Sequence, residues 1–429
     1  MTIKITDPID LPCGTQIRNR LCKAAMTEGL ADSQNRATER HLRLYEFWQQ
    51  AGVGLSLTGN ILIDRRNMER AGNVAVDGNG GDEAMQKWTK QVTADGTQFW
   101  AQIAHAGRQS PAAICDDPVA PSAIGLQMPG AEFNQPHAAS EAEIKDLIRR
   151  FAHTAETCKR NGFTGIQIHG AHGYLLSSFL SPLSNQRTDQ WGGSLENRAR
   201  IHIEVIRACR EAVGRDFPIA LKLNSADFQK GGFTEEESLQ VLNLLDAEAL
   251  DLVEISGGNY ESTAVLFGDK DANGNVMRES TIKREAYFIE YAKKARQAWH
   301  KPLMITGGFR SREAMEQALN NGELDLIGIG RPMVCNPESV GALLSGSVEE
   351  LVKVEDRLVP VTAEQLEGAP DEIRLTANTF GHLGWFYMNL FLMGDGKAPM
   401  LDASLADALH LYPPMEAEKT AKWDSPWKS

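Results

Sequence analysis

Eight short apolar segments alternate with helical patterns between about residue 21 and residue 335 of this 429-residue chain. Apolar runs of this length, separated by amphipathic helical stretches, are typical of βαβ units on a parallel sheet. Eight units over about 315 residues leave about 39 residues for each, near the repeat of a (β/α)8 TIM barrel with some insertions. We therefore predict an α/β fold of this type. The predicted strands are Leu21–Ala25, Gly54–Gly59, Phe99–Ile103, Gly165–His169, Ile219–Asn224, Leu252–Ser256, Leu303–Thr306 and Leu326–Ile329.

Helix start signals stand between the predicted strands. Ser140 is followed three residues later by Glu143, and Thr234 by Glu237. This spacing predicts a capping box, in which each side chain bonds the backbone N–H of the other residue. We expect a helix over 144–160 that closes near Gly162, and a second helix over 238–245.

Two regions do not follow the alternation. The segment 105–140 is rich in Pro, Ala and Gly, which favours a loop that covers one mouth of the barrel as a lid. We divide the rest into barrel residues 1–340 and a C-terminal extension, 341–429, that packs on the barrel. Its aromatic run, 384–391, predicts a packed helix on the outside or bottom of the barrel, and a contact between subunits of a homo-oligomer is the alternative.

Charge and cysteine usage exclude several classes of protein. The formal net charge of −13 repels phosphate backbones and anionic headgroups, so we expect neither nucleic acid nor membrane as a partner. The six cysteines show no C-x-x-C spacing, which disfavours zinc and iron–sulfur sites and favours a reduced, cytoplasmic location. The segment 269–274 opens like a calcium loop, but Ser280 stands where the closing Glu belongs, so we interpret it as a solvated turn.

Lys222 is the first candidate for chemistry. Alternation along its predicted strand directs Ala220, Lys222 and Asn224 into the barrel. A buried ammonium needs a carboxylate, a Schiff base or an anionic ligand. A structural ion pair is the alternative without a functional role.

Two glycine turns follow the seventh and eighth predicted strands, at Gly307-Gly308 and at Gly330-Arg331. Phosphate often binds at this place in such barrels, since glycine lets backbone N–H groups approach the oxygens and arginine adds a charged fork. Each turn alone could be only a tight turn, but two after consecutive strands predict a phosphate site.

His169, His172 and Tyr174 follow the fourth predicted strand. They are too few for a zinc site, and no H-E-x-x-H is present, so we expect no metal. Two neutral imidazoles can donate to a carbonyl oxygen, and a phenol with a pKa of about 10 can supply a proton. Structural histidines in the core or at the surface are the alternative.

The segment that runs from His169 through Phe179, Asn185 and Arg187 to Arg198 resembles the signature of the old yellow enzyme family, flavin-dependent NAD(P)H:alkene oxidoreductases on an eight-fold barrel. Residues 102–108, 120–122 and both glycine turns match as well, so that the similarity covers about residues 5–340. Ala25 stands where members commonly have Pro, and Trp191 where they often have Tyr. Only Cys335 follows the barrel and no dinucleotide fingerprint is present, which implies a single-domain reductase with FMN alone.

The resemblance implies tightly bound FMN across the mouth and NAD(P)H as the hydride donor. Lys222 would lie near N1 and the C2 carbonyl, stabilising the anionic reduced ring, and Gln102 would bond the pyrimidine edge. The implied cofactor-binding residues are Ala25, Met26, Thr27, Gly59, Gln102, Lys222, Gly307, Gly308, Gly330 and Arg331.

The resemblance also implies ping-pong reduction of small-molecule activated alkenes such as α,β-unsaturated ketones. His169 and His172 would bind the carbonyl oxygen, and Tyr174 would protonate the α-carbon. One alternative is a phosphate-binding lyase or aldolase in which Lys222 forms a Schiff base. A non-catalytic flavin-binding protein is the other.

Overall fold

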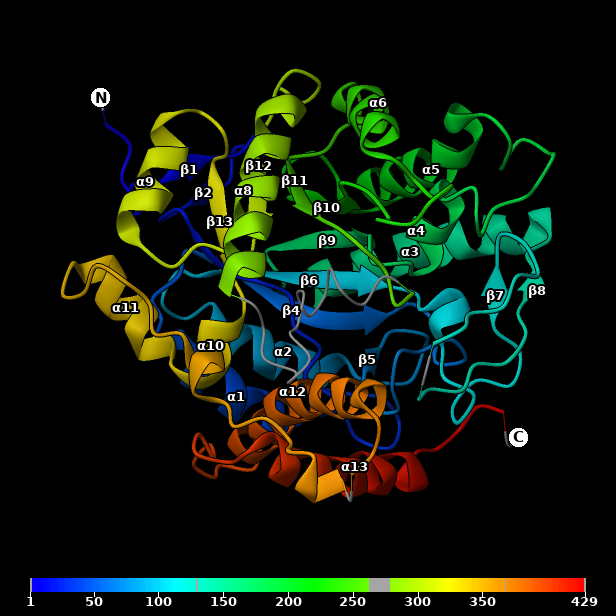
Figure 1. Cartoon of the computed structure of the whole chain (residues 1–429). Helices are drawn as coiled ribbons and strands as arrows, with labels where there is room; N and C mark the ends of the chain where they lie inside the picture. The colour runs from blue at the N-terminus through cyan, green and yellow to red at the C-terminus, as the bar shows by residue number, and fades with distance from the viewer. Residues whose placement is uncertain (1, 129, 262–277, 367, 428–429) are drawn as a thin grey trace.

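The computed structural model describes residues 2–128, 130–261, 278–366 and 368–427. Its centre is a closed barrel of eight parallel strands, in which the last strand pairs with the first (Figure 1). The predicted fold class is confirmed. The barrel strands are β3 (Leu21–Lys23), β4 (Leu55–Leu62), β6 (Gln98–Ala104), β9 (Gly165–Gly170), β10 (Ile219–Asn224), β11 (Leu252–Ser256), β12 (Leu303–Thr306) and β13 (Leu326–Ile329).

All eight predicted strands are present, and the last four have the predicted bounds. β3 is shorter than predicted because it ends at Lys23, whereas β4 continues past Gly59 to Leu62. Short strands outside the barrel are β1 (Ile9–Asp10), which pairs with β2 (Gln16–Ile17), and β5 (Val74–Ala75), which pairs in parallel with the end of β4.

A helix lies between each strand and the next. The helices that follow the eight barrel strands in turn are α1 (Glu39–Gln49), α2 (Asp82–Val92), α3 (Glu141–Arg160), α4 (Leu175–Leu180) with α5 (Leu195–Val213), α6 (Glu235–Asp246), α8 (Arg278–Ala295), α9 (Arg312–Asn320), and α10 (Arg331–Cys335) with α11 (Pro337–Ser345). Both predicted capping boxes form, at Ser140 before α3 and at Thr234 before α6. Gly162 follows α3 with a φ of 92°, a conformation that favours glycine.

The alternation predicted for β10 determines what enters the barrel. Ala220 packs inside with Leu57, Trp100 and Met304, from other strands. Ile219, Leu221 and Leu223 belong instead to the large core between strands and helices. Lys222 therefore points into the barrel, as predicted.

The segment 105–140 lies at the carboxyl ends of the strands. In Figure 1 the arrowheads of β4 and β6 point towards the side where β7 (Val119–Ala120) and β8 (His137–Ala138) pair. The short 3-10 helix η1 (Gly107–Gln109) begins the segment. Arg187, from the loop after α4, donates from Nη1 to the carbonyl oxygens of Pro121 at 2.9 Å and Ala139 at 2.6 Å.

The C-terminal part adds two long helices, α12 (Asp371–Gly394) and α13 (Leu405–Lys422), after the short 3-10 helices η2 (Val354–Arg357) and η3 (Glu364–Leu366). α12 packs on α1 and on α13, and the two long helices lie along the lower edge of the molecule in Figure 1. Trp385 of α12 is fully buried and donates from Nε1 to Ala403 O at 3.1 Å. The helix predicted over the aromatic run is confirmed, while a domain boundary at residue 340 stays a prediction.

The calcium-like loop, membrane spanning and the cysteines were also considered from the sequence. The calcium-like segment 269–274 lies outside the described residues. Of the helices within the described ranges, none is both long and apolar enough to cross a membrane. Five cysteines, Cys13, Cys22, Cys115, Cys158 and Cys209, are free thiols.

Candidate active site

Lys222 meets a carboxylate inside the barrel. Strand register places it beside His169 of β9 and Glu254 of β11. Its Nζ lies 2.9 Å from Glu254 Oε1, and Glu254 has no exposed surface. Among the partners that the sequence allowed for this lysine, the structure therefore contains the carboxylate. The pair carries no net charge, which makes burial of the ammonium tolerable.

A chain of hydrogen bonds leads from this carboxylate to Gln102. Gln167 Nε2 donates to Glu254 Oε2 at 2.7 Å, and Gln102 Nε2 donates to Gln167 Oε1 at 2.6 Å. A carboxylate can only accept, so it sets the direction of both amides. The carbonyl oxygen of Gln102 is thereby left to accept from a ligand.

His169 and His172 come together with Tyr174 at the end of β9. The His169 ring centroid lies 5.1 Å from that of His172 and 4.8 Å from that of Tyr174. Burial, followed by the neighbouring His172 and Lys222, holds the pKa of His169 well below its usual value. Burial, followed by Lys222, lowers the pKa of His172 to about 3. Both rings are therefore neutral at physiological pH.

Neighbouring groups fix these two rings. His169 Nδ1 accepts from the backbone N–H of Ala171 at 3.3 Å, so the proton of the neutral ring is on Nε2. His172 Nε2 lies 2.6 Å from Ser256 Oγ. His172 has a φ of 64°, a strained conformation for a residue with a Cβ, and its N–H bonds Asn224 Oδ1 at 3.1 Å. Such strain persists where the surroundings impose it, as they do here.

Tyr174 directly precedes α4 and is 5% exposed. Its hydroxyl lies 2.8 Å from the hydroxyl of Tyr260, on the loop after β11. Burial, followed by the nearby Glu69 carboxylate, raises the pKa of Tyr174 well above its usual value. The phenol therefore keeps its proton at neutral pH and can supply it.

The residues that follow β3 lie against the middle of β4. A Cβ on Gly59 would come within 2.6 Å of Met26 O and of Thr27 Cα, so only glycine fits there. Glu28 Oε1 accepts from Gly59 N–H at 2.8 Å and fixes this contact, and Thr27 Oγ1 donates to Glu69 at 2.7 Å. Ala25 packs against the interior cluster of the barrel. These four predicted residues, Ala25, Met26, Thr27 and Gly59, are thus grouped.

The two predicted phosphate turns are also neighbours, since β12 pairs with β13. Gly307 and Gly308 have φ values of 109° and 85°, which L side chains rarely adopt. A Cβ added at Gly307 or Gly330 would meet no heavy atom within 4 Å, which leaves room beside the backbone at both turns. Arg331 begins α10 immediately after Gly330. The space and the backbone geometry fit a phosphate group.

Together these groups fit FMN. The throat offers a cationic amine and an amide edge, and the turns after β12 and β13 offer glycine backbone with open space and an arginine. A planar ring with a phosphate tail needs this combination of donors. Among the described residues, no group of three or more His, Cys, Asp or Glu side chains could hold a metal ion.

Sequence reasoning missed several polar residues of this site. Alternation along β11 would have directed Glu254 inward, as it did Lys222 on β10, and the same holds for Gln167 on β9. Tyr260 and Glu69 lie on loops, where no periodicity indicates which way a side chain points. Only the tertiary structure brings them to Tyr174 and Thr27.

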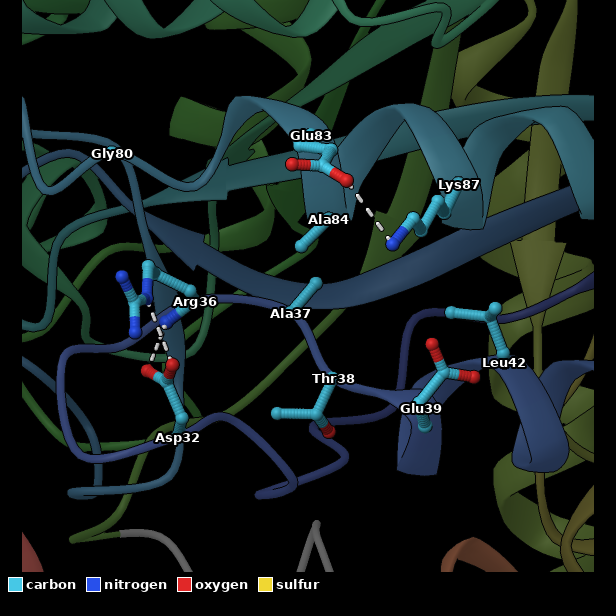
Figure 2. Close-up of a pocket in the computed structure, with 10 residues that line it drawn as sticks. All are labelled: Asp32, Arg36, Ala37, Thr38, Glu39, Leu42, Gly80, Glu83, Ala84 and Lys87. Atoms are coloured by element: carbon cyan, nitrogen blue, oxygen red, sulfur yellow. Dashed lines mark hydrogen bonds and ion pairs between the residues drawn. The ribbon is translucent and has the colours of Figure 1, made fainter.

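A separate pocket of about 280 Å³ lies near the start of α1 and α2 (Figure 2). Four of its charged side chains form two ion pairs, Arg36 with Asp32 at 2.8 Å and Lys87 with Glu83 at 3.2 Å. None of the predicted site residues lines it. The barrel mouth therefore remains the candidate site.

Comparison with protein families assigns the chain. A family model described as the NADH:flavin oxidoreductase / NADH oxidase family, whose members use FMN, matches residues 4–348. The chain belongs to this family. The resemblance to old yellow enzymes is confirmed, and FMN with NAD(P)H is the cofactor set of the family.

Two fungal relatives carry the name NADH-dependent flavin oxidoreductase iliE. The protein of Hypocrea jecorina (strain QM6a) is 35% identical over 351 residues, covering 77% of this chain and 86% of the relative. The protein of Neonectria sp. (strain DH2) is also 35% identical over 77% of this chain. The chain spans only 45% of the length of that second relative.

Solved structures confirm the fold. An old yellow enzyme homologue from Zymomonas mobilis superposes with a TM-score of 0.68 at 24% identity, covering 82% of this chain and 95% of the other. At 24% identity this similarity shows that the two proteins share the barrel fold, and no more.

Proposed function

We propose that this protein is an ene-reductase, which passes hydride from NAD(P)H by way of FMN to the β-carbon of an α,β-unsaturated carbonyl compound. The observation that carries the proposal is the group of two neutral imidazoles and a protonated phenol at the mouth of a flavin oxidoreductase barrel. Flavin reduction alone has no need of such a group. Alkene reduction needs both: the imidazoles polarise the carbonyl group of the substrate, and the phenol protonates its α-carbon.

The residues that would hold FMN are those grouped at the strand ends. Lys222 and Gln102 would contact the ring, Ala25 to Thr27 and Gly59 would support it, and the two glycine turns with Arg331 would bind the phosphate. Bound FMN supplies a centre that accepts hydride from one substrate and returns it to the next.

The imidazoles bind and polarise the second substrate. His169 donates from Nε2, because its Nδ1 accepts from Ala171 N–H. Hydrogen bonds to the carbonyl oxygen draw electrons from the conjugated double bond and make the β-carbon electrophilic. Tyr174 then gives its proton to the α-carbon. Both substrates would use one mouth in turn, so we expect ping-pong kinetics.

The pairing of Lys222 with Glu254 counts against the lyase alternative. Schiff-base formation requires a neutral amine, whereas this Nζ is held at 2.9 Å from a carboxylate. The family match also supports flavin chemistry over aldol chemistry. A non-catalytic flavin protein would not need the imidazole and phenol groups.

An absorption spectrum of the purified protein tests the proposal. We expect a flavin spectrum that NADH or NADPH bleaches under anaerobic conditions and that an added α,β-unsaturated ketone restores. A protein that binds no FMN would refute the proposal. A flavin that the nucleotides do not bleach would support the non-catalytic alternative, and a reduced flavin that no enone reoxidises would limit the activity to other acceptors.

Binding of a phenol tests the two imidazoles. Replacing His169 and His172 together by Ala should weaken the binding of a para-substituted phenol to the oxidised enzyme about 10- to 100-fold, since two hydrogen bonds to its oxygen are lost. Burial lowers the pKa of His172 to about 3 and holds that of His169 well below its usual value, so both rings stay neutral near neutral pH. The dissociation constant should therefore show no imidazole titration between pH 5.5 and pH 7.5.

Spectral titration of the bound flavin measures this constant. His300→Ala is the matched control, because this histidine is exposed, lies on the loop before β12 and pairs with Asp246 at the end of α6. Equal affinity in the double variant and the control would remove the imidazoles from the substrate site.

A further inference from the structure

Tyr260 forms a pair with the proposed proton donor. Its hydroxyl oxygen lies 2.8 Å from that of Tyr174, and either oxygen can be the donor. The two rings meet edge to face, with centroids 5.8 Å apart and planes at 70°. The Tyr174 side chain is buried, at 5% exposed, whereas Tyr260 is only partly buried. The pair therefore connects the inside of the mouth with a more accessible position.

We propose that Tyr260 is a positioning residue that orients the Tyr174 hydroxyl and replaces its proton during alkene reduction, a role that rests on the proposed ene-reductase function. As the Tyr174 O–H bond breaks and a C–H bond forms at the α-carbon, the Tyr260 O–H bond breaks and a new O–H bond forms on Tyr174. The negative charge then resides on Tyr260 oxygen. A water molecule gives Tyr260 a proton and leaves as hydroxide, which bulk buffer neutralises.

The charged groups around Tyr260 act in opposite directions on the charge that would form there. Burial and then the Glu69 carboxylate raise the pKa of Tyr260, and the hydrogen bond to Tyr174 and the Arg70 guanidinium offset part of this increase. Arg70 is held in place by the C-terminal helices. Its guanidinium carbon lies 3.7 Å from the ring centroid of Tyr387 on α12, and its Nη1 donates to the Tyr412 hydroxyl on α13 at 3.3 Å. Such stacking holds a guanidinium in one orientation.

The loop that carries Tyr260 is anchored on both sides. Glu261 pairs with Arg108 at 2.6 Å, and Arg108 also donates to Gly125 O at 3.1 Å. Asn259 makes a β-bridge with His172. The position of the Tyr260 hydroxyl is therefore set by the segment 105–140, through Arg108, and by the turn after β9, through His172. A side chain that only filled space would not need two such anchors.

The two half-reactions of the Tyr260→Phe holoenzyme, followed by anaerobic stopped-flow absorbance, test the proposal. We expect reoxidation by an α,β-unsaturated ketone to slow about 10- to 100-fold, the loss that one hydrogen bond to a developing charge implies. Reduction by NADH should keep its rate. Reoxidation by ferricyanide should keep its rate as well, because ferricyanide takes electrons without any carbon being protonated.

Tyr287→Phe is the matched control. Like Tyr260→Phe, it removes a hydrogen bond of a partly exposed tyrosine, here to Ser225 at 3.1 Å, but Tyr287 lies outside the proposed machinery. All three rates should equal those of the wild type. Flavin content and circular dichroism confirm that both variants fold and bind FMN.

The double variant Tyr174→Phe/Tyr260→Phe separates a role through Tyr174 from a general one. We expect it to reduce the enone no more slowly than Tyr174→Phe alone, since Tyr260 acts only on the Tyr174 oxygen. The proposal would be overturned if the losses of the two single variants multiplied in the double variant. It would also be overturned if Tyr260→Phe slowed the ferricyanide and enone reactions equally, or if its enone rate equalled that of Tyr287→Phe. A wild-type enzyme that no enone reoxidises would instead refute the proposed function, and this role with it.

Discussion

Replacing Tyr174 by Phe is expected to slow reoxidation by an α,β-unsaturated ketone about 100- to 10,000-fold while NADH reduces the flavin at the wild-type rate. The structure gives the physical reason. The phenol is buried, retains its proton because burial and Glu69 raise its pKa, and lies beside the ring of His169. Only the second half-reaction consumes a proton at carbon, so only that half should lose rate.

Stopped-flow absorbance of the flavin measures both halves separately. The Tyr174→Phe enzyme should also bind a phenol with nearly wild-type affinity, since the imidazoles are unchanged. Equal slowing of the two halves would contradict the acid role and would indicate that Tyr174 supports the site structurally.

Replacing Lys222 by Met is expected to lower the free energy of unfolding of the apoprotein by about 3–5 kcal/mol and to abolish tight FMN binding. The change leaves Glu254, which has no exposed surface, as an unpaired buried carboxylate. It also removes the cation that would face the ring. Urea denaturation measures the first effect, and fluorescence titration with FMN measures the second.

A double variant separates these two roles. Lys222→Met/Glu254→Gln removes both charges, so most of the lost stability should return. Tight FMN binding should not return, because no cation replaces Lys222. A single variant that binds FMN like the wild type would remove this lysine from the cofactor site.

The barrel was predictable because local patterns and tertiary structure agree. Each strand is a short apolar run between turn signals, and Ser140 and Thr234 mark helix starts through contacts within a single turn. The inward direction of Lys222 followed from the alternation of β10. Patterns that depend only on near neighbours survive folding unchanged.

The partners of the site residues were not predictable in the same way. Alternation along β11 could have placed Glu254 inside the barrel. That Glu254 lies beside Lys222, however, depends on the register between β10 and β11, which the sequence does not reveal. The contact of Tyr387 with Arg70 joins residues more than three hundred positions apart. The aromatic run predicted a helix, but which surface it covers depends on the shape of the folded barrel.

The hydrogen-bond chain from Glu254 through Gln167 to Gln102 determines which hydrogen-bonding group a ring bound in the throat would have to present. Because the buried Glu254 carboxylate can only accept, both glutamines donate towards it, and Gln102 presents its carbonyl oxygen to the throat. A ligand that bonds this oxygen must therefore donate an N–H. The imide N–H of the isoalloxazine of FMN would meet this requirement. A flavin methylated at that nitrogen should therefore bind more weakly than FMN, and Glu254→Gln, whose amide can donate, should reduce this discrimination.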